Sequence, residues 1–207
     1  MENSKIDTNE VVISGIITRL EYGFSCTGEK FQKGIIKAKR SSGTFDEIPV
    51  VISERILDKE TDYKDKFVEI KGNLRVYREK NRKKNLYIFA SEIFTSEYGV
   101  WNSNEVILTG YICKEPHLRK TPVTERNIAD VLVAYNHRYG KTFYIPRIFW
   151  GRDAKYVSEL PVGTKIEISG RVQSREYKKK ITEEEYETRV AYEVSAKEIK
   201  VVPDDKD

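Results

Sequence analysis

The sequence predicts an all-β protein of two similar five-stranded barrels in tandem, each with one short helix. Two observations lead to this prediction. The two halves of the chain repeat the same patterns in the same order, and each half consists of short apolar runs separated by turn-forming residues. The 207 residues are enough for two small domains.

The repeat consists of four pairs of segments. Residues 12–17 parallel 107–112, 48–51 parallel 145–148, 68–74 parallel 166–172, and 90–93 parallel 196–199. Such a series indicates two copies of one domain of ordinary size. The predicted division is an N-terminal copy at 9–95, a linker at 96–103, a C-terminal copy at 104–203 and a short acidic tail at 204–207.

The strands are predicted from apolar and polar residues that alternate at period two, as in Phe67–Lys71 and Lys165–Ser169. Gly72 and Gly170 fall inside these patterns, where glycine often marks a bulge or a sharp bend. We therefore expect a bulge at the same place in both copies.

The predicted helix of the C-terminal copy is Arg152–Leu160, which has apolar residues on one helical face and is ended by Pro161. Residues 53–66 are its expected counterpart in the N-terminal copy. A helix between the third and fourth strands, followed by a long charged hairpin, is the order of the OB fold. The predicted fold class is therefore two tandem OB-fold barrels.

The composition excludes several classes of protein. Lys and Arg number 37 and Asp and Glu 33, a net charge of +4 that permits a polyanionic partner. No apolar run could span a membrane and no signal-peptide pattern opens the chain, so we expect a cytoplasmic protein. Cys26 and Cys113 lack metal-ligand spacing, and neither histidine adds a cluster. We expect two buried thiols, no metal and no cofactor.

Five sequence pieces of the C-terminal copy occur in a characteristic order. They are Asn104–Gly110, Pro116–Arg119 followed by Thr121 and Pro122, Ala129–Ala134 with Asn136, Phe149–Gly151, and Gly170–Arg175. Together they resemble the bacterial single-stranded DNA-binding protein family over nearly all of residues 104–200. The resemblance implies a non-enzymatic protein that coats and protects unpaired DNA in replication, recombination or repair. It also implies a homodimer that presents four barrels.

The candidate nucleic-acid site follows from this resemblance and from the chemistry of single strands. Proteins that bind single strands without sequence preference stack bases on aromatic rings and hold phosphates with Lys and Arg. The resemblance places Tyr144, Trp150 and Tyr177 on stacking positions and Tyr139 near a fourth. The cations expected to contact phosphates are Arg119, Arg147, Arg152, Arg171 and Arg175.

Two of these residues have an alternative placement. Trp150 follows Ile148 at period two, so its ring either stacks bases on the surface or points into the barrel. Arg119 either positions a phosphate or pairs with a carboxylate.

The N-terminal copy departs from the family pattern at all three stacking positions, where Glu47, Ser53 and Glu79 replace the rings. Other rings lie nearby in the sequence, but an offset of one residue moves a strand side chain to the opposite face. These rings are Tyr77, Tyr87 and Phe89. The basic run 78–84 either touches phosphate or is a solvated hairpin. The first barrel is therefore expected to bind DNA weakly or to serve mainly in assembly.

Three other functions compete with this hypothesis. A nuclease on an OB barrel usually needs clustered carboxylates for metal ions, and the densest cluster, Glu183–Glu185, lies in a hairpin tip. The diverged first copy favours an interaction or primosome-type assembly protein with weak nucleic-acid binding. RNA binding is the third, because stacking does not distinguish the sugars. Pro203–Asp207 lacks the hydrophobic tip by which family members recruit enzymes, so recruitment by this route is not expected.

Overall fold

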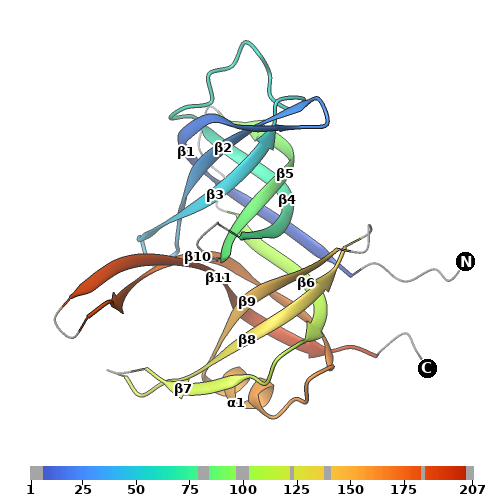
Figure 1. The fold of residues 1–207 in the computed structure, drawn as a ribbon, viewed down its shortest axis with the longest axis vertical. Coiled ribbons are helices and arrows are strands. Elements are labelled where there is room, and N and C mark those ends of the chain that lie inside the picture. Colours follow the sequence, from blue (N-terminus) through green and yellow to red (C-terminus); the bar gives the residue numbers. More distant parts are fainter. Residues whose placement is uncertain are drawn as a thin grey trace, which may run out of the picture.

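The computed structural model describes residues 7–78, 84–96, 103–121, 124–137, 141–182 and 185–203. The chain is mostly β, as predicted, and its strands form two closed rings that share one continuous sheet. Figure 1 shows the ring of the N-terminal half stacked on the ring of the C-terminal half.

The first ring contains five strands: β1 (Asn9–Cys26), β2 (Glu29–Lys39), β3 (Phe45–Ser53), β4 (Phe67–Arg78) and β5 (Lys84–Thr95). β1 pairs with both β2 and β4, and β3 pairs in parallel with β5, which closes the ring. Apolar residues at alternate positions fill its interior, as Ile48, Val50 and Ile52 do on β3.

The second ring repeats this order with β6 (Asn104–Ile112), β8 (Asn127–Asn136), β9 (Thr142–Trp150), β10 (Lys165–Lys180) and β11 (Tyr186–Val201). β9 pairs in parallel with β11, and β6 pairs with both β8 and β10. A short strand, β7 (His117–Lys120), is added at the edge of β8. Both rings therefore have the strand connections of a five-stranded OB barrel.

The bulges predicted at Gly72 and Gly170 are confirmed. The register of β4 with β5 shifts between Lys71 and Gly72, and that of β10 with β11 shifts between Ser169 and Gly170. A Cβ atom at either glycine would overlap the backbone carbonyl that crosses it, from Phe89 or Ser195. Glycine is therefore required where the backbones of the bent strands come closest.

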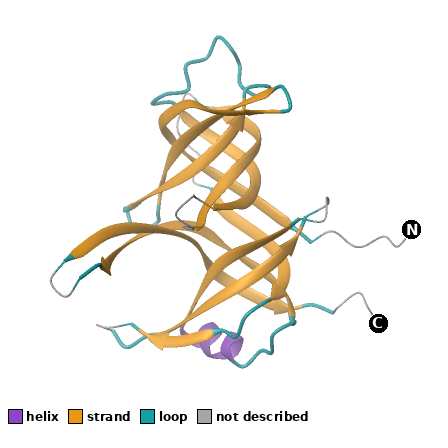
Figure 2. Cartoon of the chain, in the orientation of Figure 1, coloured by secondary structure: helices purple, strands orange, loops and turns teal. Residues whose placement is uncertain are grey.

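The helix of the C-terminal half is confirmed as α1 (Gly151–Ser158), with Ala154 and Val157 buried against the barrel (Figure 2). The helix expected at 53–66 is wrong, because this described segment consists of turns. The carboxylate of Asp58 accepts hydrogen bonds from the amide of Glu60 and the hydroxyl of Thr61. Such local bonds compete with the helical pattern.

The two barrels are joined by antiparallel pairing of β1 with β6, centred where Val11 lies opposite Val106. These two residues are equivalent in the repeat, so the joint has approximate two-fold symmetry. The side-chain amide of Asn9 donates to the backbone C=O of Leu74 and accepts from its N–H. The side chain of Asn104 makes the same two hydrogen bonds with Val172. The long blue strand in Figure 1 thus ties the first barrel to the second.

A second joint links β3 of the first barrel to β10 of the second. The fully buried carboxylate of Asp46 accepts hydrogen bonds from Nε of Arg40 at 2.6 Å and from the backbone amide of Ser174 at 2.7 Å. The guanidinium of Arg40 also donates to the carbonyl of Ser174 at 3.0 Å. Because charge-assisted bonds are strong when partly desolvated, this cluster holds the hairpin of the second barrel against the first.

Two smaller findings concern the thiols and the membrane. Cys26 is exposed and Cys113 half-buried, so the expectation that both thiols are buried is wrong. No helix among the described residues is long and apolar enough to cross a membrane.

Asp46→Ala is predicted to lower the free energy of unfolding by about 1–3 kcal/mol, because it leaves the partly buried amide of Ser174 and the guanidinium of Arg40 without their acceptor. Urea unfolding measures this change. The matched control is Glu47→Ala, which removes an exposed neighbouring carboxylate and should change stability by less than about 0.5 kcal/mol. Equal effects of the two substitutions would contradict this role of Asp46.

Candidate nucleic-acid interface

The outer face of β9 carries two of the predicted stacking rings. Ile145 and Phe149 point into the barrel core, so Tyr144 and Trp150 lie on the outer face of the strand. Tyr144 is 44% exposed and lies opposite Ala134 of β8. Six residue steps along the extended strand place the Cα atoms of Tyr144 and Trp150 about 20 Å apart.

The indole of Trp150 is held in place from two sides. Its Nε1 donates a hydrogen bond to Oγ of Ser195 at 3.1 Å, and the guanidinium of Arg126 lies 5.5 Å from the ring centroid. Gly151 has a positive φ of 61°, which turns the chain sharply from β9 into α1. Of the two placements left open by the sequence, Trp150 thus takes the outer one, half-buried.

A hollow of about 540 Å³ lies beside this ring. It is lined by Arg40, Arg126, Trp150, Asp153, Arg171, Gln173, Ser174, Arg175, Ser195, Ala196 and Lys197. Five of these side chains are cationic and one is a carboxylate, so the hollow attracts anions although the net charge of the chain is small. Among described residues, no carboxylate lies at ion-pair distance from Arg126, Arg171 or Lys197.

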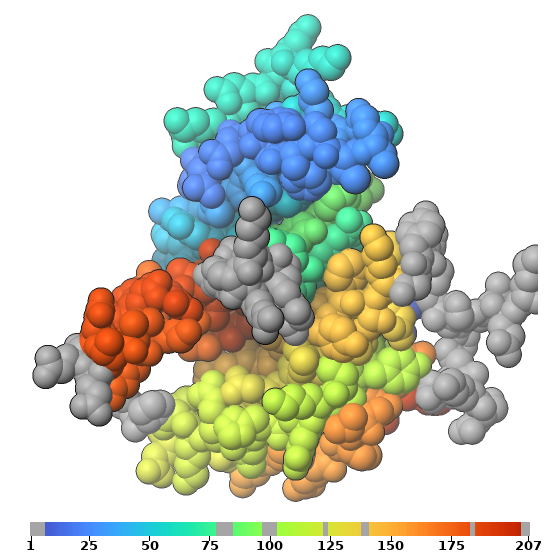
Figure 3. All heavy atoms as spheres, viewed as in Figure 1, coloured from blue at the N-terminus to red at the C-terminus, as the bar shows by residue number. Residues whose placement is uncertain are grey.

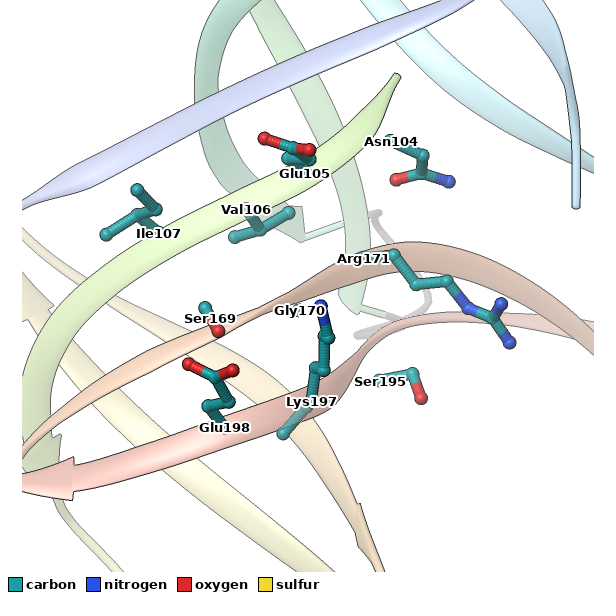
Figure 4. A pocket seen from close by; sticks show the side chains of 11 residues that line it. Asn104, Glu105, Val106, Ile107, Ser169, Gly170, Arg171, Ser195, Lys197 and Glu198 are labelled. Atoms are coloured by element: carbon teal, nitrogen blue, oxygen red, sulfur yellow. The ribbon is translucent and has the colours of Figure 1, made fainter. Parts of the chain in front are cut away.

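Two of these cations, Arg171 and Lys197, also border a second hollow of about 570 Å³ at the bulge between β10 and β11. In Figure 4, Arg171 extends from β10 and Lys197 rises from β11, with Ser195 between them. In the same view Glu105 lies on β6, and Glu198 lies on β11 beside Ser169 of β10 (Figure 4). The positive charge is therefore concentrated toward Trp150 and falls off toward the shared sheet.

Tyr177 lies on the hairpin formed by β10 and β11, which projects from the side of the molecule (Figure 3). The guanidinium of Arg175 is 5.8 Å from its ring centroid, and Arg189 lies opposite it on β11. Arg175 is also paired with Glu193 at 3.2 Å, which holds the guanidinium beside the ring. Exposed lysines 178–180 continue the strand beyond Tyr177.

Comparisons with known proteins agree with this geometry. The Single-strand binding protein family matches residues 103–202. A single-stranded DNA-binding protein from Clostridium tetani is 34% identical over 103 residues, covering 47% of this chain and 68% of the relative. Single-stranded DNA-binding protein 3 from Clostridium acetobutylicum is 31% identical over 96 residues, covering 44% and 67%.

The chain belongs to the single-strand binding protein family. Members of this family are binding proteins and not enzymes. The described residues contain no cluster of His, Cys, Asp or Glu suited to a metal ion, and Glu183 and Glu184 lie outside them.

Solved structures extend the likeness to both barrels. The wild-type single-stranded DNA-binding protein from Thermus aquaticus superposes with a TM-score of 0.74 and 21% identity, covering 96% of this chain and 95% of that one. A deletion mutant of the same protein gives the same TM-score and covers 97% of each chain. This likeness establishes the tandem fold over nearly the whole chain.

Two of the arginines predicted to contact phosphate, Arg119 and Arg147, are not available at the interface. Arg119 binds Asp130 through Nε at 2.6 Å and Nη2 at 3.2 Å, so it takes the carboxylate partner that the sequence left open. This hydrogen bond raises the pKa of Arg119 above its ordinary value. Arg147 is 2% exposed, because it lies on the inner face of β9 between Ile145 and Phe149. The expectation that Arg147 contacts phosphate is therefore corrected.

Of the remaining residues predicted for the site, some line the hollow beside Trp150 and others do not. Arg171 and Arg175 share the hollow with Trp150, whereas Arg152 is exposed on α1 and does not line it. Tyr139 lies outside the described residues. In the first barrel Glu47 is exposed and Ser53 is buried, and Glu79 lies outside the described residues.

Sequence reasoning missed three cations of the hollow. Arg126 immediately precedes β8, and Lys197 is the extra residue of the bulge in β11, between Ala196 and Glu198. The basic character of these positions was the available signal. Arg40 comes from the first barrel, and only the packing of one barrel on the other brings it to the site.

Arg147→Met is predicted to raise the free energy of unfolding by about 1–4 kcal/mol while leaving DNA affinity unchanged. Nε and Nη2 of Arg147 are buried without hydrogen-bond partners in the structure, so methionine removes an uncompensated charge at similar volume. Denaturant unfolding and DNA titration test the two halves of this prediction. A loss of DNA affinity in Arg147→Met would contradict the conclusion that Arg147 does not contact DNA.

The free energy of unfolding of the wild type should also depend on pH differently from that of Arg147→Met. Burial lowers the pKa of Arg147 to about 9, whereas the guanidinium in the unfolded chain keeps its much higher ordinary pKa. Above about pH 9 the unfolded state binds more protons, so the wild-type free energy of unfolding rises relative to that of Arg147→Met. The stability difference between them should narrow as the pH increases through 9, and a constant difference would contradict the assignment.

Proposed function

We propose that this chain coats and protects single-stranded DNA during replication, recombination or repair, without base-specific readout. The observation that carries the proposal is the ring of Trp150, held on the outer barrel surface beside cations that lack carboxylate partners among the described residues. A single strand offers bases to stack and phosphates to neutralise, and this surface provides for both. The names of the relatives support the same ligand.

In the proposed complex, bases stack on Tyr144, Trp150 and Tyr177, each contributing about 1–3 kcal/mol. Tyr144 and Trp150 share one strand face, and Tyr177 extends the path onto the hairpin. Phosphates contact Arg171, Arg175 and the neighbouring Arg126 and Lys197, and Arg152 extends this positive surface onto α1. Tyr139 stays a predicted stacking ring.

We further propose a homodimer that presents four barrels. Its interface is the outer face of the sheet shared by β1 and β6, where Ile16, Phe94 and Ile107 are each at least 40% exposed. Among the described residues of this face carboxylates outnumber lysines, which disfavours DNA there. Apolar side chains on a broad sheet favour a second copy as the partner.

Titration of the full chain with oligo-dT, an RNA oligomer of equal length and a DNA duplex tests the proposed function. We expect oligo-dT to quench tryptophan fluorescence and to bind more tightly than the duplex, and Trp150→Phe to lose most of the quench. Equal affinity for the duplex would contradict the proposal. Tighter binding of RNA would reassign the ligand.

Tyr144→Ala is expected to weaken oligo-dT binding by about 1–3 kcal/mol, because one stacking surface is removed. The matched control is Tyr156→Ala, which removes an equally exposed ring from α1 that does not line the hollow beside Trp150. Fluorescence titration gives both affinities. Wild-type affinity in Tyr144→Ala would remove this ring from the proposed site.

The affinity for oligo-dT should fall as salt increases, with a slope in log affinity against log salt of about −0.7 for each phosphate neutralised. Arg171→Ala should make this slope shallower by about 0.7, because one phosphate contact is lost. Lys59→Ala, which removes an exposed cation from the far loop of the first barrel, should leave the slope unchanged. Identical slopes in all three proteins would exclude Arg171 from the phosphate path.

A further inference from the structure

The first barrel has a hollow of its own, of about 400 Å³, that the stacking positions of the family do not account for. The lining residues that matter for binding are Arg19, Phe24, Lys33, Tyr77, Tyr87 and Tyr192. Five of them belong to the first barrel, but Tyr192 comes from β11 of the second. The hollow is therefore built by both barrels together.

The rings that line this hollow face outward. Leu86 and Ile88 point into the core of the first barrel, so Tyr87 lies between them on the outer face of β5. Tyr77 of the neighbouring strand β4 meets Tyr87 edge to face, with ring centroids 5.5 Å apart, and is 42% exposed. Rings near the altered family positions are thus accessible, on the face that a base could reach.

The hollow lies at a position of the first barrel that the repeat makes equivalent to the outer face of β9. Pro49, which also lines it, is the equivalent of Pro146, and Pro146 lies on the outer face of β9 between Tyr144 and Trp150. The first barrel therefore presents its hollow where the second barrel presents the middle of its proposed base-stacking face. Its rings come from other elements, because they project from β1, from the turn end of the β4–β5 hairpin and from the other barrel.

The charge of the hollow suits a nucleotide. The ammonium of Lys33 lies 5.8 Å from the ring centroid of Phe24, and the side chain of Arg19 is 61% exposed beside Glu21. Among the described residues that line the hollow there is no carboxylate, although Glu47 lies near Tyr192. Cations beside flat rings, with few acids, are the combination that binds the backbone and the base of a single strand.

The tyrosine hydroxyls add hydrogen-bonding capacity. Burial is the main cause that raises the pKa of Tyr87 and of Tyr192, and the nearby Glu47 raises that of Tyr192 further. Both hydroxyls therefore keep their protons at neutral pH and can donate to the edge of a base.

We propose that this hollow binds one nucleobase of a DNA strand that continues from the second barrel onto the first. The base stacks against Tyr77 and Tyr87 with Tyr192 at its edge, and Arg19 and Lys33 hold the adjoining phosphates. This inference rests on the proposed function and extends it, because it makes the first barrel part of the DNA path. Tyr192 makes the site dependent on both barrels of one chain.

Two lengths of oligo-dT test the proposal on the full chain. An oligomer of about 8 nucleotides fills one barrel, whereas one of about 30 spans both. Tyr77→Ala should weaken binding of the long oligomer about 5- to 150-fold and leave the short one within about two-fold. Tyr77→Phe keeps the ring and should bind both as wild type does, and Tyr156→Ala serves as the control for loss of an exposed ring elsewhere.

Photocrosslinking shows where the base lies. A long oligomer carrying 5-iododeoxyuridine should crosslink to peptides that contain Tyr77, Tyr87 or Tyr192, as well as to those of the second barrel. If wild type binds the long oligomer with tryptophan quenching but Tyr77→Ala is unchanged, or if no crosslink maps to the hollow, the inference is overturned and the proposed function stands. If wild type binds neither oligomer, the proposed function itself fails.

Discussion

The pairing of β1 with β6 is the constraint on which the rest of the structure depends. It satisfies the backbone groups of residues 9–13 and 104–108, which the pairings within each barrel leave open on one side, and it joins the two barrels in one continuous sheet. Asp46 then ties β3 to Ser174 of β10, so the long hairpin of the second barrel lies against the first. Arg40 reaches the hollow beside Trp150, and Tyr192 reaches the hollow of the first barrel, only because this arrangement is fixed.

Charge and aromatic rings are distributed unevenly over this framework. The sheet face around β1 and β6 carries carboxylates and exposed aliphatic side chains, whereas the cations collect beside Trp150 on the outside of the second barrel. A net charge of +4 therefore understates the local field. The two barrels use the same fold differently: the second places rings along β9, and the first gathers rings from hairpins and from its neighbour.

Local signals predicted the fold well. Period-two alternation and the repeated glycines gave the strands and both bulges, because these features depend on neighbouring residues alone. The helix at 53–66 was wrong because Asp58 captures nearby amide and hydroxyl groups. The prediction that Arg147 contacts phosphate was wrong, although the alternation of Ile145 and Phe149 already indicates that its side chain points inward. Arg40 and Tyr192 could not be predicted, because their roles arise from contact between the barrels.

A crystal structure of the full chain with a long oligo-dT tests most directly where the single strand lies. We expect bases to lie flat against Tyr144 and Trp150 on the outer face of β9, with phosphates beside Arg171. DNA bound instead on the acidic sheet face of β1 and β6, with the indole of Trp150 uncovered, would contradict this expectation.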